Sequence, residues 1–191
     1  MNEEQEVIQL VKEAYQFGKD FGYLDVSFEK FLEEARARDV NDDSRKSRGE
    51  LGHYIIKAAE EKNLGFSVDW KQWEAEDIIW FAKKAVPDLP IEFVKEDYVD
   101  RFPFKGVVGG SAVVVTLKIF GKETTLTIPN EYPMDLVAII NRNLPTSYQD
   151  RTFVEREYNG DSHAFLLIKK DLLSKFKDNK FIKFNTSSRI S

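Results

Sequence analysis

The spacing of apolar residues changes once along this 191-residue chain, and that change constrains the fold more than any other feature. Before Pro87 the apolar residues recur every three or four positions, which is typical of amphipathic helices. After Pro90 they alternate at every second position in several segments, which is typical of strands. We therefore predict an α+β fold, in which an N-terminal bundle of about four helices precedes a mostly antiparallel sheet.

Four segments of the first half have helical spacing. The first carries an apolar stripe over Val7–Phe21, and the second begins at Ser27, a residue type that caps helices. The third follows the polar loop Asp39–Arg48 and opens with the capping box Ser47-x-x-Glu50, which begins inside the last residues of that loop. The fourth is expected from about Val68 to Ala85 and ends before the proline-rich junction.

The first hairpin of the second half is expected around Gly121-Lys122. A two-residue loop with glycine first suits a type II′ turn between strands over residues 112–120 and 123–128. That register places Ile119 opposite Thr124 and gathers the apolar residues of both strands on one face.

A second hairpin is expected around Asn159-Gly160, the strongest turn signal in the chain. A type I′ turn there places Arg156 opposite His163. Helices over residues 133–141 and 169–176 and a last strand over residues 180–184 complete the order ββαββαβ.

Charge changes at the same place as the apolar spacing. Residues 1–90 carry 13 basic and 20 acidic residues, whereas residues 91–191 carry 15 basic and 13 acidic residues, within a net charge of −5. We predict a helical subdomain over residues 1–88 and a sheet subdomain over residues 89–191, either sharing an interface or forming one continuous domain.

The chain has no cysteine and two histidines, His53 and His163, which excludes several classes of site. Without cysteine there is no disulfide, thiolate zinc site, iron–sulfur cluster or cysteine nucleophile. Two imidazoles cannot form a three-histidine metal site, so we expect neither a metal nor a cofactor. The N-terminal segment is acidic, and no apolar run is long enough to span a bilayer. We therefore expect a cytoplasmic protein without membrane association.

One short motif points to an enzyme. Arg48 and His53 have the spacing Arg-x4-His, which resembles the Arg-x4–6-His signature of HEPN-type ribonucleases, themselves helical bundles. The resemblance implies metal-independent cleavage of RNA by these two residues. On an ideal helix they lie about 140° apart, so we do not expect them to share a cleft. Arg156 and His163 match the same Arg-x4–6-His pattern across the second hairpin, so the motif does not distinguish a ribonuclease site from a chance match.

Trp70, Trp73 and Trp80 are the most unusual feature of the expected fourth helix. At about 100° per residue they fall within an arc of about 80° on one face of that helix. Two interpretations follow. Either the tryptophans dock the helix onto the sheet, or they form an exposed surface that binds a protein partner.

The loop before the third helix carries Asp39, Asp42 and Asp43, in the half of the chain with excess acidic residues. An acidic surface speeds the encounter with a basic protein, and desolvated tryptophans then hold that protein. We therefore predict a partner-binding surface that combines these aspartates with the three tryptophans.

From these features we expect a non-catalytic protein-binding module, of the immunity or antitoxin type, that inhibits a basic partner enzyme by forming a stoichiometric complex. A metal-independent ribonuclease that uses Arg48 and His53 is the alternative, and a structural or assembly subunit is a second alternative. Binding of nucleic acid is not expected, because the chain is acidic overall despite seven basic residues in Lys169–Ser191.

Overall fold

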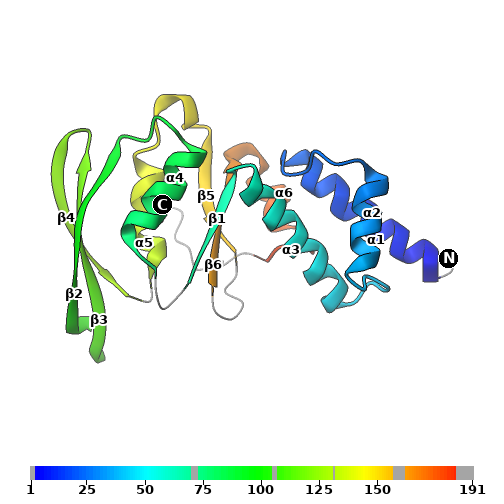
Figure 1. Cartoon of the computed structure of the whole chain (residues 1–191), viewed down its shortest axis with the longest axis horizontal. Helices are drawn as coiled ribbons and strands as arrows, with labels where there is room; N and C mark the ends of the chain where they lie inside the picture. Colours follow the sequence, from blue (N-terminus) through cyan, green and yellow to red (C-terminus); the bar gives the residue numbers. More distant parts are fainter. Residues whose placement is uncertain (1–2, 70–72, 105–106, 131, 157–161, 184–191) are drawn as a thin grey trace.

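The computed structural model describes residues 3–69, 73–104, 107–130, 132–156 and 162–183. Their helices and strands form four layers, stacked along the longest axis of the molecule in the order sheet, helices, sheet, helices (Figure 1). The α+β class predicted from the change of apolar spacing is confirmed.

The helical layer at the N-terminal end contains α1 (Glu3–Asp20), α2 (Phe28–Ala37), α3 (Arg45–Glu61) and the short α6 (Leu173–Lys177). Their apolar faces share one core, in which Val11, Ile55 and Phe176 are fully buried. The same core includes Leu166 from the neighbouring sheet, so the helical layer packs directly on that sheet.

The central sheet contains β1 (Gly65–Asp69), β5 (Arg151–Glu155) and β6 (Ser162–Lys169), antiparallel in the order β1-β6-β5. Residues His163–Ile168 of β6 are all buried, because helices cover both faces of the sheet. Leu166 faces the helical layer, and its neighbour Phe165 faces the core on the other side. β1 comes from the first half of the chain and pairs with β6 from the second; the division into residues 1–88 and 89–191 stays a prediction.

Two helices lie between the central sheet and an outer sheet. These are α4 (Ala75–Ala85) and α5 (Pro133–Arg142), and the outer sheet contains β2 (Ile91–Phe104), β3 (Val107–Ile119) and β4 (Lys122–Pro129) in the order β2-β3-β4. Helical turns η1 (Thr146–Tyr148) and η2 (Lys170–Leu172) connect the remaining elements. Both neighbouring residues Ile78 and Ile79 of α4 are buried, as expected for a helix covered on two sides.

The prediction of a fourth N-terminal helix from Val68 is wrong at its start. Gly65–Asp69 form strand β1, and α4 begins only at Ala75. Pairing of Phe66 with Phe165 in β6 buries this strand, so tertiary contacts outweigh the local helical spacing. The four-helix bundle is replaced by α1, α2, α3 and α6, while α4 lies between the two sheets.

The start of α3 also differs from its prediction. The helix begins at Arg45, and Ser44 is its cap, because the Ser44 hydroxyl accepts a hydrogen bond from the Ser47 N–H at 3.2 Å. Ser47 is buried and donates its own hydroxyl to Asp42 Oδ1 at 2.9 Å, which leaves no capping box with Glu50. The cap of α2 at Ser27 is confirmed.

The β3–β4 hairpin has the predicted strands but a register shifted by two residues. Ile119 lies opposite Lys122 instead of Thr124. The loop is Phe120-Gly121, with φ angles of 48° and 78°, which is the type I′ conformation. A shift of two residues leaves every side chain on its predicted face, so the apolar face survives the error.

The second half of the chain has the order βββαββα, not ββαββαβ. Strand β2 was not anticipated, and residues 180–183 are not a strand although Ile182 is buried. The β5–β6 register differs by one residue from its prediction: Glu155 lies opposite Phe165, and the Arg156 N–H bonds to the Ala164 carbonyl. Arg156 is therefore not the cross-strand partner of His163. The predicted turn Asn159-Gly160 lies outside the described residues.

Candidate functional site: a basic groove beside α3

A groove of about 870 Å³ runs between α3 and residues 178–183, which we call the C-terminal segment. Six cationic side chains and one carboxylate, that of Glu50, are among the described residues that line it. The cations come from three parts of the chain: Arg45, Lys46 and Arg48 on α3, Arg156 after β5, and Lys180 and Lys183 on the C-terminal segment. We call this site the basic groove.

Close backbone packing brings the C-terminal segment against α3. At Gly52 a Cβ atom would lie 2.2 Å from the Phe181 carbonyl oxygen, closer than any real contact allows. Glycine is therefore required where the segment crosses the helix. The preceding glycine of the helix, Gly49, has open space where a Cβ atom would lie, and it lines the groove.

The side chain of Asn179 fixes the shape of the segment. Its carbonyl oxygen accepts hydrogen bonds from the N–H groups of Phe181 at 2.8 Å and Ile182 at 2.7 Å. Its amide group donates to the carbonyl of Ile182 at 2.9 Å and to that of Phe176. One amide thus satisfies several backbone groups of the turn that carries Lys180 and Lys183.

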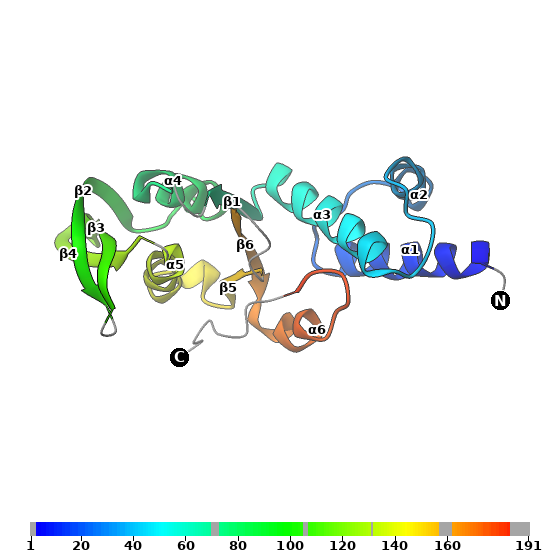
Figure 2. The same ribbon diagram turned by 90° about the horizontal axis from the view of Figure 1, so that it is seen from below.

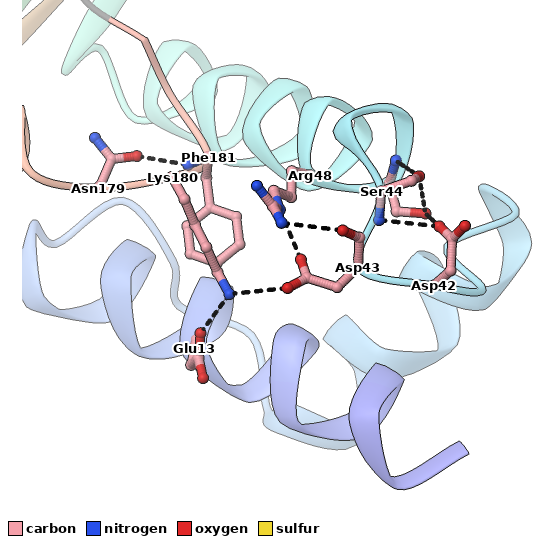
Figure 3. Close-up of polar contacts among 9 residues, drawn as sticks. Glu13, Asp42, Asp43, Ser44, Arg48, Asn179, Lys180 and Phe181 are labelled. Carbon is pink, nitrogen blue, oxygen red and sulfur yellow. Dashed lines mark hydrogen bonds and ion pairs between the residues drawn. The ribbon is translucent and has the colours of Figure 1, made fainter. Parts of the chain in front are cut away.

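Arg48 and Lys180 form ion pairs that join three segments (Figure 3). Lys180 Nζ lies 2.8 Å from Glu13 Oε2 on α1 and 3.6 Å from Asp43 Oδ2 in the loop before α3. Arg48 donates to Asp43 Oδ1 at 2.6 Å and to the Asp43 carbonyl at 3.0 Å. The hydrogen bond from Arg48 lowers the pKa of Asp43, and that from Lys180 lowers the pKa of Glu13.

Arg156 differs from these paired cations. Its guanidinium is half-buried, and no described residue forms an ion pair or side-chain hydrogen bond with it. Burial lowers the pKa of Arg156, and the charge of Glu60 opposes that shift. A partly desolvated cation without an ion pair to any described residue is unfavourable, so an anion that entered the groove would be stabilised there.

The three tryptophans do not form one surface. Trp73 is 2% exposed and donates its indole N–H to the Asn130 carbonyl at 2.5 Å. This residue is therefore part of the core and not of an exposed surface. Trp80 is 51% exposed, with Lys84 Nζ 3.5 Å from the centre of its ring. Trp70 lies outside the described residues. The expected arc assumed a helix throughout, whereas α4 begins after Trp73.

The aspartates of the predicted acidic surface have local partners. Asp42 accepts from the Ser44 N–H at 3.2 Å and from the Ser47 hydroxyl, so it supports the start of α3. Asp43 joins the ion pairs of the groove wall, and Asp39 is exposed at a φ of 55° that ends α2. Their contribution to partner binding stays a prediction.

The expectation that Arg48 and His53 do not share a cleft is wrong, because both line the basic groove. The C-terminal segment and α3 enclose enough of the helix surface to include both positions. Arg48 is nevertheless held by Asp43. His163 is in the central sheet, where its Nδ1 forms a hydrogen bond with Glu155 and both side chains are buried. This pair was missed, because it depends on the observed register: Glu155 faces Phe165, and His163 is its diagonal neighbour.

The remaining predictions concern metal binding and membrane association, and two observations within the described ranges bear on them. No group of three or more potential metal-ligating side chains is gathered in these ranges. No helix within them is both long and apolar enough to cross a bilayer. A cytoplasmic location stays a prediction.

No protein-family model, curated protein or solved structure matches the chain. The chemistry of the residues therefore carries the functional argument.

Proposed function

We propose that the protein binds a single-stranded nucleic acid by its phosphates in the basic groove. The observation that carries the proposal is Arg156, a half-buried guanidinium without an ion pair to any described residue, in a groove that five further cations also line. Guanidinium groups bind phosphate oxygens through two parallel hydrogen bonds. A recess of 870 Å³ has the size of a small-ligand site, which accommodates a few nucleotides of one strand.

The net charge of −5 does not oppose this proposal, because it is unevenly distributed. Residues 1–44 carry 12 acidic and 5 basic residues, whereas residues 45–191 carry 21 acidic and 23 basic residues. Screening limits the influence of a distant charge to about 8–10 Å at physiological salt. The potential inside the groove is therefore governed by its own cations.

Fluorescence anisotropy with a labelled oligouridylate tests the proposal. Arg156→Gln is expected to weaken binding about tenfold, the loss of one charge-assisted contact. It should also reduce the slope of log K against log salt by about 0.7, because one phosphate contact is lost. Arg36→Gln, the same change on an exposed arginine of α2 outside the groove, is the control and should bind like the unaltered protein. Equal binding by both variants would exclude the groove.

Cleavage of the bound strand is a second candidate function, because Arg48 and His53 both line the groove. It predicts RNA cleavage that persists in EDTA and is lost in His53→Ala. Since Asp43 holds the Arg48 guanidinium, this candidate also requires that Asp43→Asn increase cleavage by releasing Arg48. Intact RNA after incubation with the purified protein would exclude cleavage, and binding without cleavage would then be the proposed function.

A stoichiometric complex with a basic partner enzyme, of the immunity or antitoxin type, is the third candidate. The excess of acidic residues in residues 1–44 supports it, since α1 and α2 form an end of the molecule (Figure 1). Affinity capture followed by mass spectrometry tests it. The captured protein should be basic, should be lost with Glu33→Lys on the exposed surface of α2, and should be retained with Arg156→Gln.

A further inference from the structure

The two edges of the outer sheet differ in regularity. β2 pairs with β3 through three shifts of register, and its exposed residues include Lys95, Asp97 and Asp100. Bulges and charges of this kind protect an edge from pairing with another strand. β4 pairs with β3 without interruption from Lys122 to Pro129, and its charges lie at one end. β4 therefore offers a regular edge.

The turn before β4 determines which backbone groups point outward. In a two-residue hairpin the residues that flank the loop, here Ile119 and Lys122, form a hydrogen-bonded pair. Alternate residues then direct their N–H and C=O groups away from β3, and these are Glu123, Thr125 and Thr127. All three are exposed, and none donates a backbone hydrogen bond to another described element.

We infer that the β4 edge binds a second copy of this chain, antiparallel and related by a two-fold axis at Thr125. This register forms three hydrogen-bonded pairs: Glu123 with Thr127 of the second copy, Thr125 with itself, and Thr127 with Glu123. It opposes no two like charges, and it places two threonines together, which is a favourable cross-strand pair. An axis at Glu123 would instead oppose two carboxylates.

Helix α5 extends the same surface. α5 contacts β4 and α4 contacts β2, so β4 and α5 lie along one side of the molecule and β2 and α4 along the other (Figure 2). Asp135 and Arg142 are exposed at the two ends of α5, with the half-buried Ile139 between them. Their spacing of seven residues is two helical turns, so they share a face. A two-fold axis that makes the helices antiparallel brings Asp135 of one copy towards Arg142 of the other.

This reciprocity favours a second copy over an unrelated strand. The strand pairs with itself in register, and the helix beside it carries opposite charges at positions that the same axis exchanges. The outcome is a continuous six-stranded sheet with the order β2-β3-β4-β4-β3-β2.

Cysteine cross-linking tests the axis, because the natural chain has no cysteine. In the proposed dimer the two Thr125 Cα atoms are about 5.5 Å apart, whereas the two Thr127 positions are offset by about 13 Å along the strands. A thiol cross-linker much shorter than 13 Å should join Thr125→Cys into a covalent dimer and leave Thr127→Cys monomeric. Adding Glu123→Cys to Thr127→Cys should restore the covalent dimer.

Light scattering over a dilution series provides the second measurement. The unaltered chain should reach twice its monomer mass at high concentration, and Thr125→Pro should remain monomeric. Proline at this outward position removes no hydrogen bond to β3, and circular dichroism verifies that the variant is folded. A monomeric natural chain at all concentrations, or equal cross-linking of Thr125→Cys and Thr127→Cys, would overturn the inference.

Discussion

Glu155 and Arg156 are consecutive residues, yet they lie on opposite faces of the central sheet and have opposite environments. Side chains alternate along a strand, so Glu155 faces the layer of α4 and α5 and Arg156 faces the helical layer of α3. Glu155 is 3% exposed and hydrogen-bonded to His163, which is 5% exposed. Arg156 is half-buried in an open groove without a described anionic partner.

The difference separates a structural polar group from one to which the proposed function assigns ligand binding. A buried polar group that is hydrogen-bonded inside the protein contributes to the folded state. An unpaired cation in a groove reduces its own unfavourable desolvation only when an anion arrives. Burial alone therefore does not identify a functional residue in this sheet; the presence or absence of an internal partner does.

Removing the carboxylate of the buried pair has the largest expected effect. Glu155→Ala leaves the His163 imidazole buried without that partner and creates a cavity, so we expect a loss of about 3 kcal/mol in the free energy of unfolding. Urea denaturation measures the loss. Glu92→Ala, at an exposed position of β2, is the control and should change stability by less than about 0.5 kcal/mol. Similar values for the two variants would contradict the structural role of Glu155.

The two hairpins indicate how far sequence predicts such pairs. Apolar alternation identified the strands of the β3–β4 hairpin, and the Asn159-Gly160 turn signal identified those of the β5–β6 hairpin. Register depends on the conformation of the loop, which the turn signals alone did not define. The β3–β4 error of two residues preserved the faces, whereas the β5–β6 error of one residue paired Arg156 with His163 and hid the contact with Glu155.

The basic groove was beyond prediction for a different reason. The sequence contains its parts as two separate features, the Arg48–His53 motif and the basic segment that begins at Lys169, which are over a hundred positions apart. Their meeting depends on Gly52, whose missing side chain admits the C-terminal segment. A single glycine inside a helical pattern carries no signal of what will pack on it.

Gly52→Ala has the next largest expected effect. Its Cβ atom would meet the Phe181 carbonyl, so the C-terminal segment must move away from α3 and the variant should lose about 1–3 kcal/mol. Gly49→Ala lies one turn away in open space and should be neutral or stabilise the helix by up to about 1 kcal/mol. Thermal unfolding of the pair measures this. If Gly49→Ala were the more destabilising variant, the position of the segment would be wrong.

Arg156→Gln is expected to change stability by less than about 0.5 kcal/mol, in contrast to its neighbour Glu155. No described ion pair is lost, and the substitution removes a partly desolvated charge. Urea denaturation in the absence of nucleic acid measures this change in stability. A loss comparable to that of Glu155→Ala would show that Arg156 has a structural partner, and the contrast between the two faces would fail.

The last expected effect concerns the stability of the folded protein in acid and the ion pairs of Lys180. Its hydrogen bond lowers the pKa of Glu13 in the folded protein, so the stabilisation is present above the unfolded pKa, near 4.5, and is lost as the pH falls through the folded value. Asp43, whose pKa is lowered chiefly by Arg48 and further by Lys180, behaves in the same way below about 3.8. Because these side chains are largely exposed, solvent screening limits the gain to less than about 1 kcal/mol.

Lys180→Gln isolates this contribution. The difference in unfolding free energy between Lys180→Gln and the unaltered protein should be constant above about pH 5 and should decrease as the pH falls below the unfolded pKa values and through the lowered folded pKa values of Glu13 and Asp43. Lys177→Gln, an exposed change on α6, should show no such dependence and serves as the control. A difference for Lys180→Gln that did not decrease on acidification would mean that the contact of Lys180 with the Phe181 ring, whose centre lies 5.7 Å from Nζ, stabilises the groove wall more than its ion pairs do.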